Sequence, residues 1–301
     1  MAIASGLTKK RHAKERLVRA VTLLCALVSI VTTVGIVYVL VSESIGFFME
    51  VSPWEFFTGT RWTPLLEPKS FGVLPLLNGT MMIAVGAGII AVPTGLLIAV
   101  HLSEYAAQRT RRVVKPLLEL LAGVPTIVYG FFALTFVTPL LRSFIPELPV
   151  FNALSAMIVV GIMILPMVSS LSEDALAAVP KDLREGALAL GATKGEVIRG
   201  VVIPGALSGV MSAFILALAR AVGETMAVTL AAGATAKMTL DPTESVQTMS
   251  AYIVQVSLGD TPQGTLEYQT IFAVGLTLFM LTLTMNLLAN RLVTRFRQRY
   301  V

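Results

Sequence analysis

Two ionisable residues lie near the middle of one of the most apolar stretches of the chain. Arg220 and Glu224 fall within Gly205–Ala232, which otherwise has the composition of a membrane-spanning helix. An isolated charge at the centre of a bilayer costs about 2.5–3.5 kcal/mol on insertion scales, so each of these side chains needs a partner. Residues four apart share a face of a helix, and the spacing therefore predicts an ion pair.

This predicted pair has two interpretations. Small side chains leave space beside the charges along the same helix face, at Ala213, Ala217, Gly223 and Ala227. A neighbouring helix could fill that space, in which case the pair is structural. Alternatively, the space belongs to a water-accessible pathway, in which Arg220 binds an oxyanion through forked hydrogen bonds and Glu224 holds the guanidinium between passages.

A polar segment at 179–209 predicts two short helices that meet at a glycine. Thr193 and Glu196 form a T-x-x-E capping box, which marks the start of the second helix. Gly191 interrupts the first helix, and we expect it to adopt a positive φ or to make a close contact. The run Gly186–Thr193 has the glycine spacing of a phosphate-binding loop, but Ala192 occupies the lysine position. We therefore expect no ATP hydrolysis by this chain.

The composition is that of an integral membrane protein. The chain has 301 residues, of which 55% are hydrophobic and 14% charged, and its mean hydropathy is +0.80. Soluble domains carry about 25% charged residues. The single cysteine excludes a disulfide within the chain, and no Cys/His cluster has the spacing of metal ligands. We expect no catalytic residue, no metal and no cofactor bound by this chain.

Six stretches are long and apolar enough to cross a bilayer as helices of ~20 residues. The predicted fold class is therefore all-α and integral to the membrane, with six transmembrane helices. The first apolar run is too long for the hydrophobic region of a signal peptide, and we interpret it as an uncleaved span. The six predicted spans are Leu17–Val41, Leu74–Val100, Val113–Leu141, Ala153–Leu171, Gly205–Ala232 and Thr270–Leu292.

Basic residues predict that both chain ends lie in the cytoplasm. Eighteen of the 23 lysines and arginines flank the spans on the side of the termini, and four lie on the other side. The net charge of +5 is thus a topology signal, which favours membrane lipid and argues against nucleic acid as a partner. The expected organisation is a cytoplasmic tail (1–16), a first span with its outer loop (17–73), a core domain (74–293) that includes a cytoplasmic coupling loop (172–204), and a second cytoplasmic tail (294–301).

The cytoplasmic loop resembles the EAA signature of permease subunits of type I ABC importers, E-A-A-(x3)-G-(x9)-I-x-L-P. Gly186 replaces the first alanine of the signature, and Ile203 stands at the leucine position. The resemblance implies the type I importer fold and a loop that docks on a separate ATPase and transmits its closure. A merely structural amphipathic loop is the alternative. The residues to which the coupling role is carried over are Glu185, Gly186, Ala187, Gly191, Ile203 and Pro204.

Further stretches narrow the resemblance to phosphate-specific importers and their PstC-type permease. They are SPWEFFTGTRWTP (52–64), FGVLPLLNGT (71–80), ELLAGVPTIVYGFF (119–132) and RAVGETMAV (220–228). The resemblance implies a subunit of an ATP-driven importer of inorganic phosphate in the bacterial inner membrane, with Arg220 and Glu224 on the pathway. Its implied partners are a PstA-type permease, two PstB-type ATPase subunits that hold ATP and Mg, and a PstS-type phosphate-binding protein.

Several alternatives stay open at this point. Another oxyanion, such as sulfate or molybdate, could be the substrate. An ion-coupled secondary transporter would need its own coupling-ion site and usually internal repeats, yet Glu224 is the only central carboxylate and we find no repeat.

Gly123, Pro125 and Gly130 predict a kink and a close approach in the third span. Aromatic residues of the first outer loop, namely Trp54, Phe56, Phe57 and Trp62, form either an interfacial belt or a contact for a substrate-delivering protein.

Overall fold

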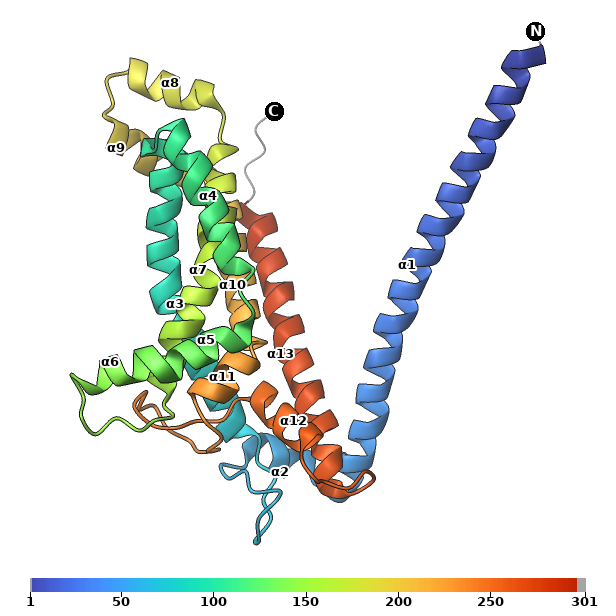
Figure 1. Ribbon diagram of the computed structural model, residues 1–301, viewed down its shortest axis with the longest axis vertical. Coiled ribbons are helices and arrows are strands. Elements are labelled where there is room, and N and C mark those ends of the chain that lie inside the picture. The colour runs from blue at the N-terminus through green and yellow to red at the C-terminus, as the bar shows by residue number, and fades with distance from the viewer. Residues whose placement is uncertain (1, 297–301) are drawn as a thin grey trace.

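The computed structural model describes residues 2–296, which contain helices and no β-strand (Figure 1). The predicted all-α class is confirmed, whereas the predicted tails, 1–16 and 294–301, lie partly outside the described residues. The elements are α1 (Ala2–Glu50), α2 (Pro53–Thr58), α3 (Leu74–Val100), the π-helical turn η1 (His101–Tyr105), α4 (Gln108–Ala122), α5 (Thr126–Phe132), the π-helical turn η2 (Ala133–Val137), α6 (Thr138–Arg142), α7 (Ala153–Ala177), α8 (Lys181–Ala189), α9 (Lys194–Val197), the π-helical turn η3 (Ile198–Val202), α10 (Ile203–Val222), α11 (Met226–Ala231), α12 (Met249–Leu258) and α13 (Leu266–Phe296).

Five helical segments of the described chain are long and apolar enough to cross a membrane, and there are six if a bent pair of helices counts as one span. The bent pair joins Gln108–Ala122 to Thr126–Arg142 at an angle of 89°. Pro125 lies in the break and has no N–H to continue the hydrogen bonds of α4. The predicted kink at Gly123 and Pro125 is therefore confirmed, and it is sharp enough to turn the second half of this span across the bundle (Figure 1).

The fifth span differs from the prediction, because it is not one helix over Gly205–Ala232. Helix α10 ends at Val222, and α11 begins only at Met226. At the cytoplasmic end, by contrast, helical structure extends further than predicted, since Lys194–Val222 forms one continuous segment that passes through Pro204. A proline in the first turn of α10 is tolerated there, and the preceding π-helical turn adjusts the hydrogen bonding of the backbone.

The core of the protein lies where α3, α7 and α10 pack together. Buried small residues of these helices, among them Ala87, Ala156 and Ala217, let the backbones approach closely. Helix α1 stands apart from this bundle and contacts α13 only near its outer end (Figure 1). The cytoplasmic helices α8 and α9 lie at the opposite end of the molecule from α2 and α12 (Figure 1).

Candidate functional site

Arg220 lies at the end of α10, and Glu224 lies in the break of the fifth span that follows this helix. Arg220 belongs to the last turn of α10, and its side chain is 46% exposed, whereas that of Glu224 is 3% exposed. The distance from Arg220 Nη2 to Glu224 Oε2 is 4.0 Å, so the predicted ion pair is present at the outer limit of such contacts. A guanidinium at this distance keeps most of its five N–H donors available for another acceptor.

The buried carboxylate of Glu224 is held by the segment that follows it. Its Oε1 accepts a hydrogen bond from the Ala227 N–H at 3.2 Å, within the first turn of α11. The Ser250 hydroxyl, at the start of α12, donates to the Glu224 backbone carbonyl at 2.7 Å. These contacts fix the carboxylate beside Arg220 and explain why the helix restarts after Glu224.

The small residues predicted beside the pair fall into two groups. Ala213, Ala217 and Ala227 are buried against neighbouring helices of the same chain. Gly223, in the break, is exposed, and a methyl group there would meet only the backbone of its own helix at 3.7 Å. Of the four small residues, Gly223 is therefore the one that leaves open space beside Arg220 and Glu224.

Two half-helices meet next to this break. Gly130 in α5 packs directly on α11, because a methyl group at Gly130 would lie 2.9 Å from Leu230 Cβ and 3.2 Å from Ala227 Cα. This is the close approach predicted for Gly130. The Tyr129 hydroxyl donates to the Leu121 carbonyl at 2.7 Å and so connects the two sides of the bend. Both interrupted spans thus contribute a half-helix to the surroundings of Glu224.

The cytoplasmic loop has the predicted two-helix form. Gly191 has a φ of +87°, and Thr193 and Glu196 form both hydrogen bonds of the capping box, which confirms both predictions. Of the residues carried over from the EAA signature, Glu185, Gly186, Gly191 and Pro204 are exposed, while Ala187 and Ile203 are half-buried. Helix α8 buries none of its residues and exposes Leu183 and Leu188, and Leu190 directly after it is exposed as well. The loop therefore presents an apolar surface outward.

Charged contacts that sequence reasoning missed hold this cytoplasmic end together. Arg184 in α8 donates to Glu104 Oε1 at 2.8 Å and to the Leu176 carbonyl at 2.6 Å, which fixes α8 to η1 and α7. Glu173 is fully buried at the end of α7 and forms ion pairs with Arg111 and with Lys115, the latter at 2.9 Å. The sequence did contain a signal for these ion pairs. Glu173 and Asp174 end an apolar stretch, and the preceding cytoplasmic loop contains a run of basic residues.

The aromatic segment of the first outer loop divides between core and surface. Phe56 and Trp62 are 0% and 4% exposed and pack in a cluster with Phe47, Phe71 and Tyr252. Trp54 and Phe57 are 79% and 51% exposed. Neither interpretation of the segment thus applies to all four aromatic residues, because two of them build the outer core.

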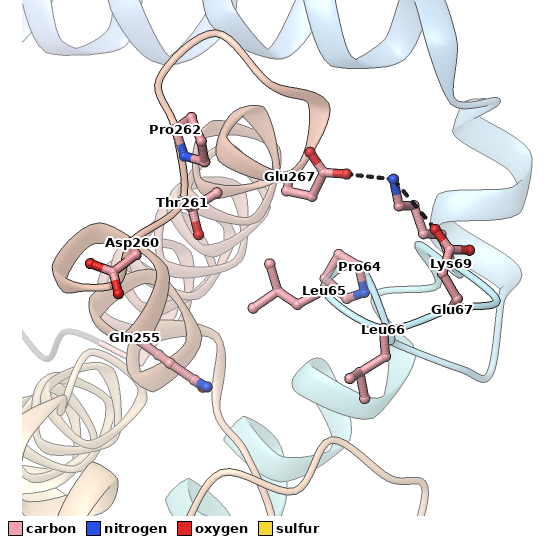
Figure 2. Close-up of a pocket in the computed structure, with 11 residues that line it drawn as sticks. Pro64, Leu65, Leu66, Glu67, Lys69, Gln255, Asp260, Thr261, Pro262 and Glu267 are labelled. Atoms are coloured by element: carbon pink, nitrogen blue, oxygen red, sulfur yellow. Dashed lines mark ion pairs between the residues drawn. The ribbon is translucent and has the colours of Figure 1, made fainter.

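A cavity of about 440 Å³ opens on the outer side, between the first outer loop and the connection from α12 to α13 (Figure 2). Lys69 Nζ lies 2.7 Å from Glu267 Oε1 and 3.7 Å from Glu67 Oε1, and its hydrogen bond to Glu267 raises the pKa of Lys69. Asp260 adds a third carboxyl group to the lining. Three carboxylates against one ammonium make this cavity unsuited to an anion.

Broken spans around a half-buried ion pair, together with a projecting cytoplasmic loop, define a helical membrane transport subunit. Residues 91–300 match the family described as "Binding-protein-dependent transport system inner membrane component", and the chain belongs to this family. It is accordingly a permease subunit of an ABC importer and a multi-pass protein of the bacterial inner membrane.

Relatives match nearly the whole chain. The probable ABC transporter permease protein YqgH of Bacillus subtilis is 36% identical over 279 residues, covering 92% of this chain and 90% of that protein. The phosphate transport system permease protein PstC of Mesorhizobium japonicum is 33% identical, covering 99% of this chain and 98% of that protein.

Solved structures share the fold at low identity. A chain of a bacterial alginate ABC transporter superposes with a TM-score of 0.58 at 16% identity, covering 88% of this chain and 96% of that one. A chain of the inward-facing methionine transporter MetNI superposes with a TM-score of 0.56 at 19% identity, covering 75% and 95%. The predicted type I importer permease fold is therefore confirmed.

Proposed function

We propose that this chain is the permease subunit of an ATP-driven phosphate importer and that Arg220 and Glu224 lie on the phosphate pathway. The observation that carries the proposal is the position of the pair. A half-exposed guanidinium stands 4.0 Å from a carboxylate that is 3% exposed, at a break in a membrane-spanning helix. Relatives named as phosphate permeases support the choice of substrate.

The geometry suits transient binding of an oxyanion. Phosphate oxygens accept paired hydrogen bonds from a guanidinium fork, and Arg220 is exposed on the side where Gly223 leaves space. Glu224 competes for the same guanidinium, so phosphate is bound without being trapped. The backbone contacts of Glu224 with Ala227 and Ser250 keep this competitor in place.

We further propose that the loop between α7 and α10 couples this pathway to a separate ATPase. Glu185, Gly186 and Ala187 lie on α8, and Gly191 lies in the turn between α8 and α9. Ile203 and Pro204 begin α10, the helix that carries Arg220. Movement of α8 would reach α7 and η1 through Arg184. In this proposal ATP and Mg belong to two PstB-type ATPase subunits, and a PstA-type permease and a PstS-type phosphate-binding protein complete the complex.

The test is phosphate uptake by the assembled transporter in proteoliposomes. Arg220→Gln removes the charged donor, and a hydrogen bond to a charged group contributes about 1.5–3 kcal/mol, so we expect uptake to fall by about 10- to 100-fold. Arg220→Lys keeps the charge but loses the fork, and we expect it to restore little. Arg112→Gln, at an exposed cytoplasmic position, is the matched control.

Two results would contradict the pathway role. One is uptake at the wild-type rate by the Arg220→Gln complex. The other is loss of uptake only because the complex no longer assembles, which would assign the pair to structure. Uptake of sulfate or molybdate in preference to phosphate by the wild-type complex would instead assign the chain to another oxyanion.

A further inference from the structure

A second cavity lies at the cytoplasmic end of the membrane domain, between the end of α3 and the start of the α9–α10 segment. We propose that it binds the head group and upper acyl chain of an anionic phospholipid. Its volume is about 500 Å³. It contains neither residue of the proposed phosphate pathway, and the inference holds whichever anion is transported. The lining residues are Leu96, Leu97, Val100, Tyr105, Thr193, Gly195, Glu196, Ile198, Arg199 and Ile203.

The lining changes from apolar to polar along the cavity. On the α3 side, Leu97 and Val100 precede Tyr105, and at 1.5 Å per residue Leu97 and Tyr105 are about 12 Å apart along the helix axis. The opposite wall runs from Ile203 at the apolar end to Thr193 at the polar end. A phospholipid has the same change in polarity over a similar length, from its acyl chains to its head group.

The cavity also lies at the depth where lipid head groups begin. Helix α3 starts at Leu74 on the outer side, and about 20 residues of helix cross the hydrocarbon core. Leu96 and Leu97 therefore lie at its inner boundary, and Leu97 is 70% exposed. Surfaces at this depth face the cytoplasmic leaflet, where anionic lipids give a negative surface potential.

The charges around the cavity favour an anionic ligand. Arg199 is exposed, and we find no hydrogen bond or ion pair of its side chain within the described residues. Lys194 Nζ lies 4.7 Å from the centre of the Tyr105 ring. The Glu196 carboxylate is already engaged by the backbone N–H and the hydroxyl of Thr193, each at 2.7 Å.

The aliphatic walls decide between a lipid and free phosphate as the source of the anion. Leu96, Leu97 and Val100 offer nothing to a small hydrated anion, whereas they bury part of an acyl chain at ~25 cal/mol per Å². Because the bound lipid would contact both α3 and α9, it would stabilise the position of the coupling loop. We therefore expect anionic lipid to stimulate the ATPase activity of the complex.

Two glycines of one helical segment provide a matched steric test. Gly195 lines the cavity and Gly200 does not, and a methyl group at either position meets nothing within 4 Å. We expect Gly195→Leu to fill the cavity, to remove one bound phosphatidylglycerol per complex in native mass spectrometry and to abolish the lipid stimulation. Gly200→Leu should bind and respond as the wild type does. Equal lipid counts in the two variants would overturn the proposal.

A charge test uses nanodiscs in which phosphatidylglycerol gradually replaces phosphatidylcholine. A basic residue near the surface contributes ~1 kcal/mol to anionic lipid binding, so Arg199→Gln should raise the half-saturating phosphatidylglycerol fraction about fivefold. The exposed Arg109→Gln is the control for overall charge. An unchanged response of Arg199→Gln would contradict the proposal. So would efficient cross-linking of Leu97→Cys to another subunit, because protein would then cover the cavity.

Discussion

At the residue scale, the protein places one carboxylate where burial is costly. Glu224 is 3% exposed, and an unpaired charge in such a position costs several kcal/mol. Its contacts with Arg220 and with the Ala227 N–H offset that cost. In the proposed function, the charge of Glu224 also lets it compete with the transported anion for Arg220.

Glu224→Gln separates these two roles. The amide oxygen can still accept from Ala227, so we expect assembly to be unchanged. Without the competing charge, phosphate should bind Arg220 more tightly and leave more slowly, and both kcat and KM should fall, by roughly tenfold if the competition is worth ~1.4 kcal/mol. Initial uptake rates over a range of phosphate concentrations measure both constants. A rise in KM at constant kcat would contradict competition.

At the scale of elements, the protein combines interrupted helices in its membrane-spanning part with short capped helices in its cytoplasmic loop. α5 and α11 are half-helices packed through Gly130. The coupling loop, by contrast, is fixed by Arg184, by the capping box and by the turn at Gly191. The proposed coupling role requires a rigid loop, and the turn between α8 and α9 contains the positive φ of Gly191.

Gly191→Ala tests that turn, with Gly200→Ala as its control. A methyl group meets nothing within 4 Å at either position, but only Gly191 has a positive φ. An L-residue in this conformation costs about 1–2 kcal/mol, so we expect Gly191→Ala to lower the phosphate transported per ATP hydrolysed, while Gly200→Ala leaves this ratio unchanged. Parallel measurement of uptake and hydrolysis gives the ratio. Equal ratios in the two variants would mean that the turn is dispensable for coupling.

At the scale of the whole molecule, the distribution of charge and apolar surface places the chain in the membrane. The outer end contains the aromatic cluster around Phe47 and Phe56, and the cytoplasmic end contains the ion pairs of Glu173 and Arg184. Helix α1 is apolar over Lys14–Glu50, and none of its most apolar window is buried within the protein. Such a surface is matched to lipid or to other membrane helices.

Cysteine labelling in intact cells checks this orientation. In a Cys25→Ser background, we expect Glu67→Cys to react with an impermeant thiol reagent from outside, because Glu67 lies on the exposed outer loop. Glu185→Cys on α8 should react only after the cells are opened. Labelling of position 185 in intact cells would contradict the topology with both ends in the cytoplasm.

The sequence by itself determined the features that depend on local chemistry. Hydropathy located the spans, and the basic residues predicted their orientation. Backbone sterics at Pro125 and Gly191 and the spacing of Thr193 and Glu196 predicted a kink, a turn and a cap, all of which are present. Each of these depends on interactions between residues close together in the chain.

Only the tertiary structure decided the features whose partners lie far apart in the chain. The break of the fifth span at Gly223 is stabilised by Ser250 of the following segment, whose hydroxyl donates to the Glu224 carbonyl 26 residues away. Glu173 is paired with Lys115, 58 residues away. Phe56 and Trp62 are buried because the first outer loop folds onto α12. The spacing of these residues carries no signal for such contacts, since it is the packing of the helices that brings the partners together.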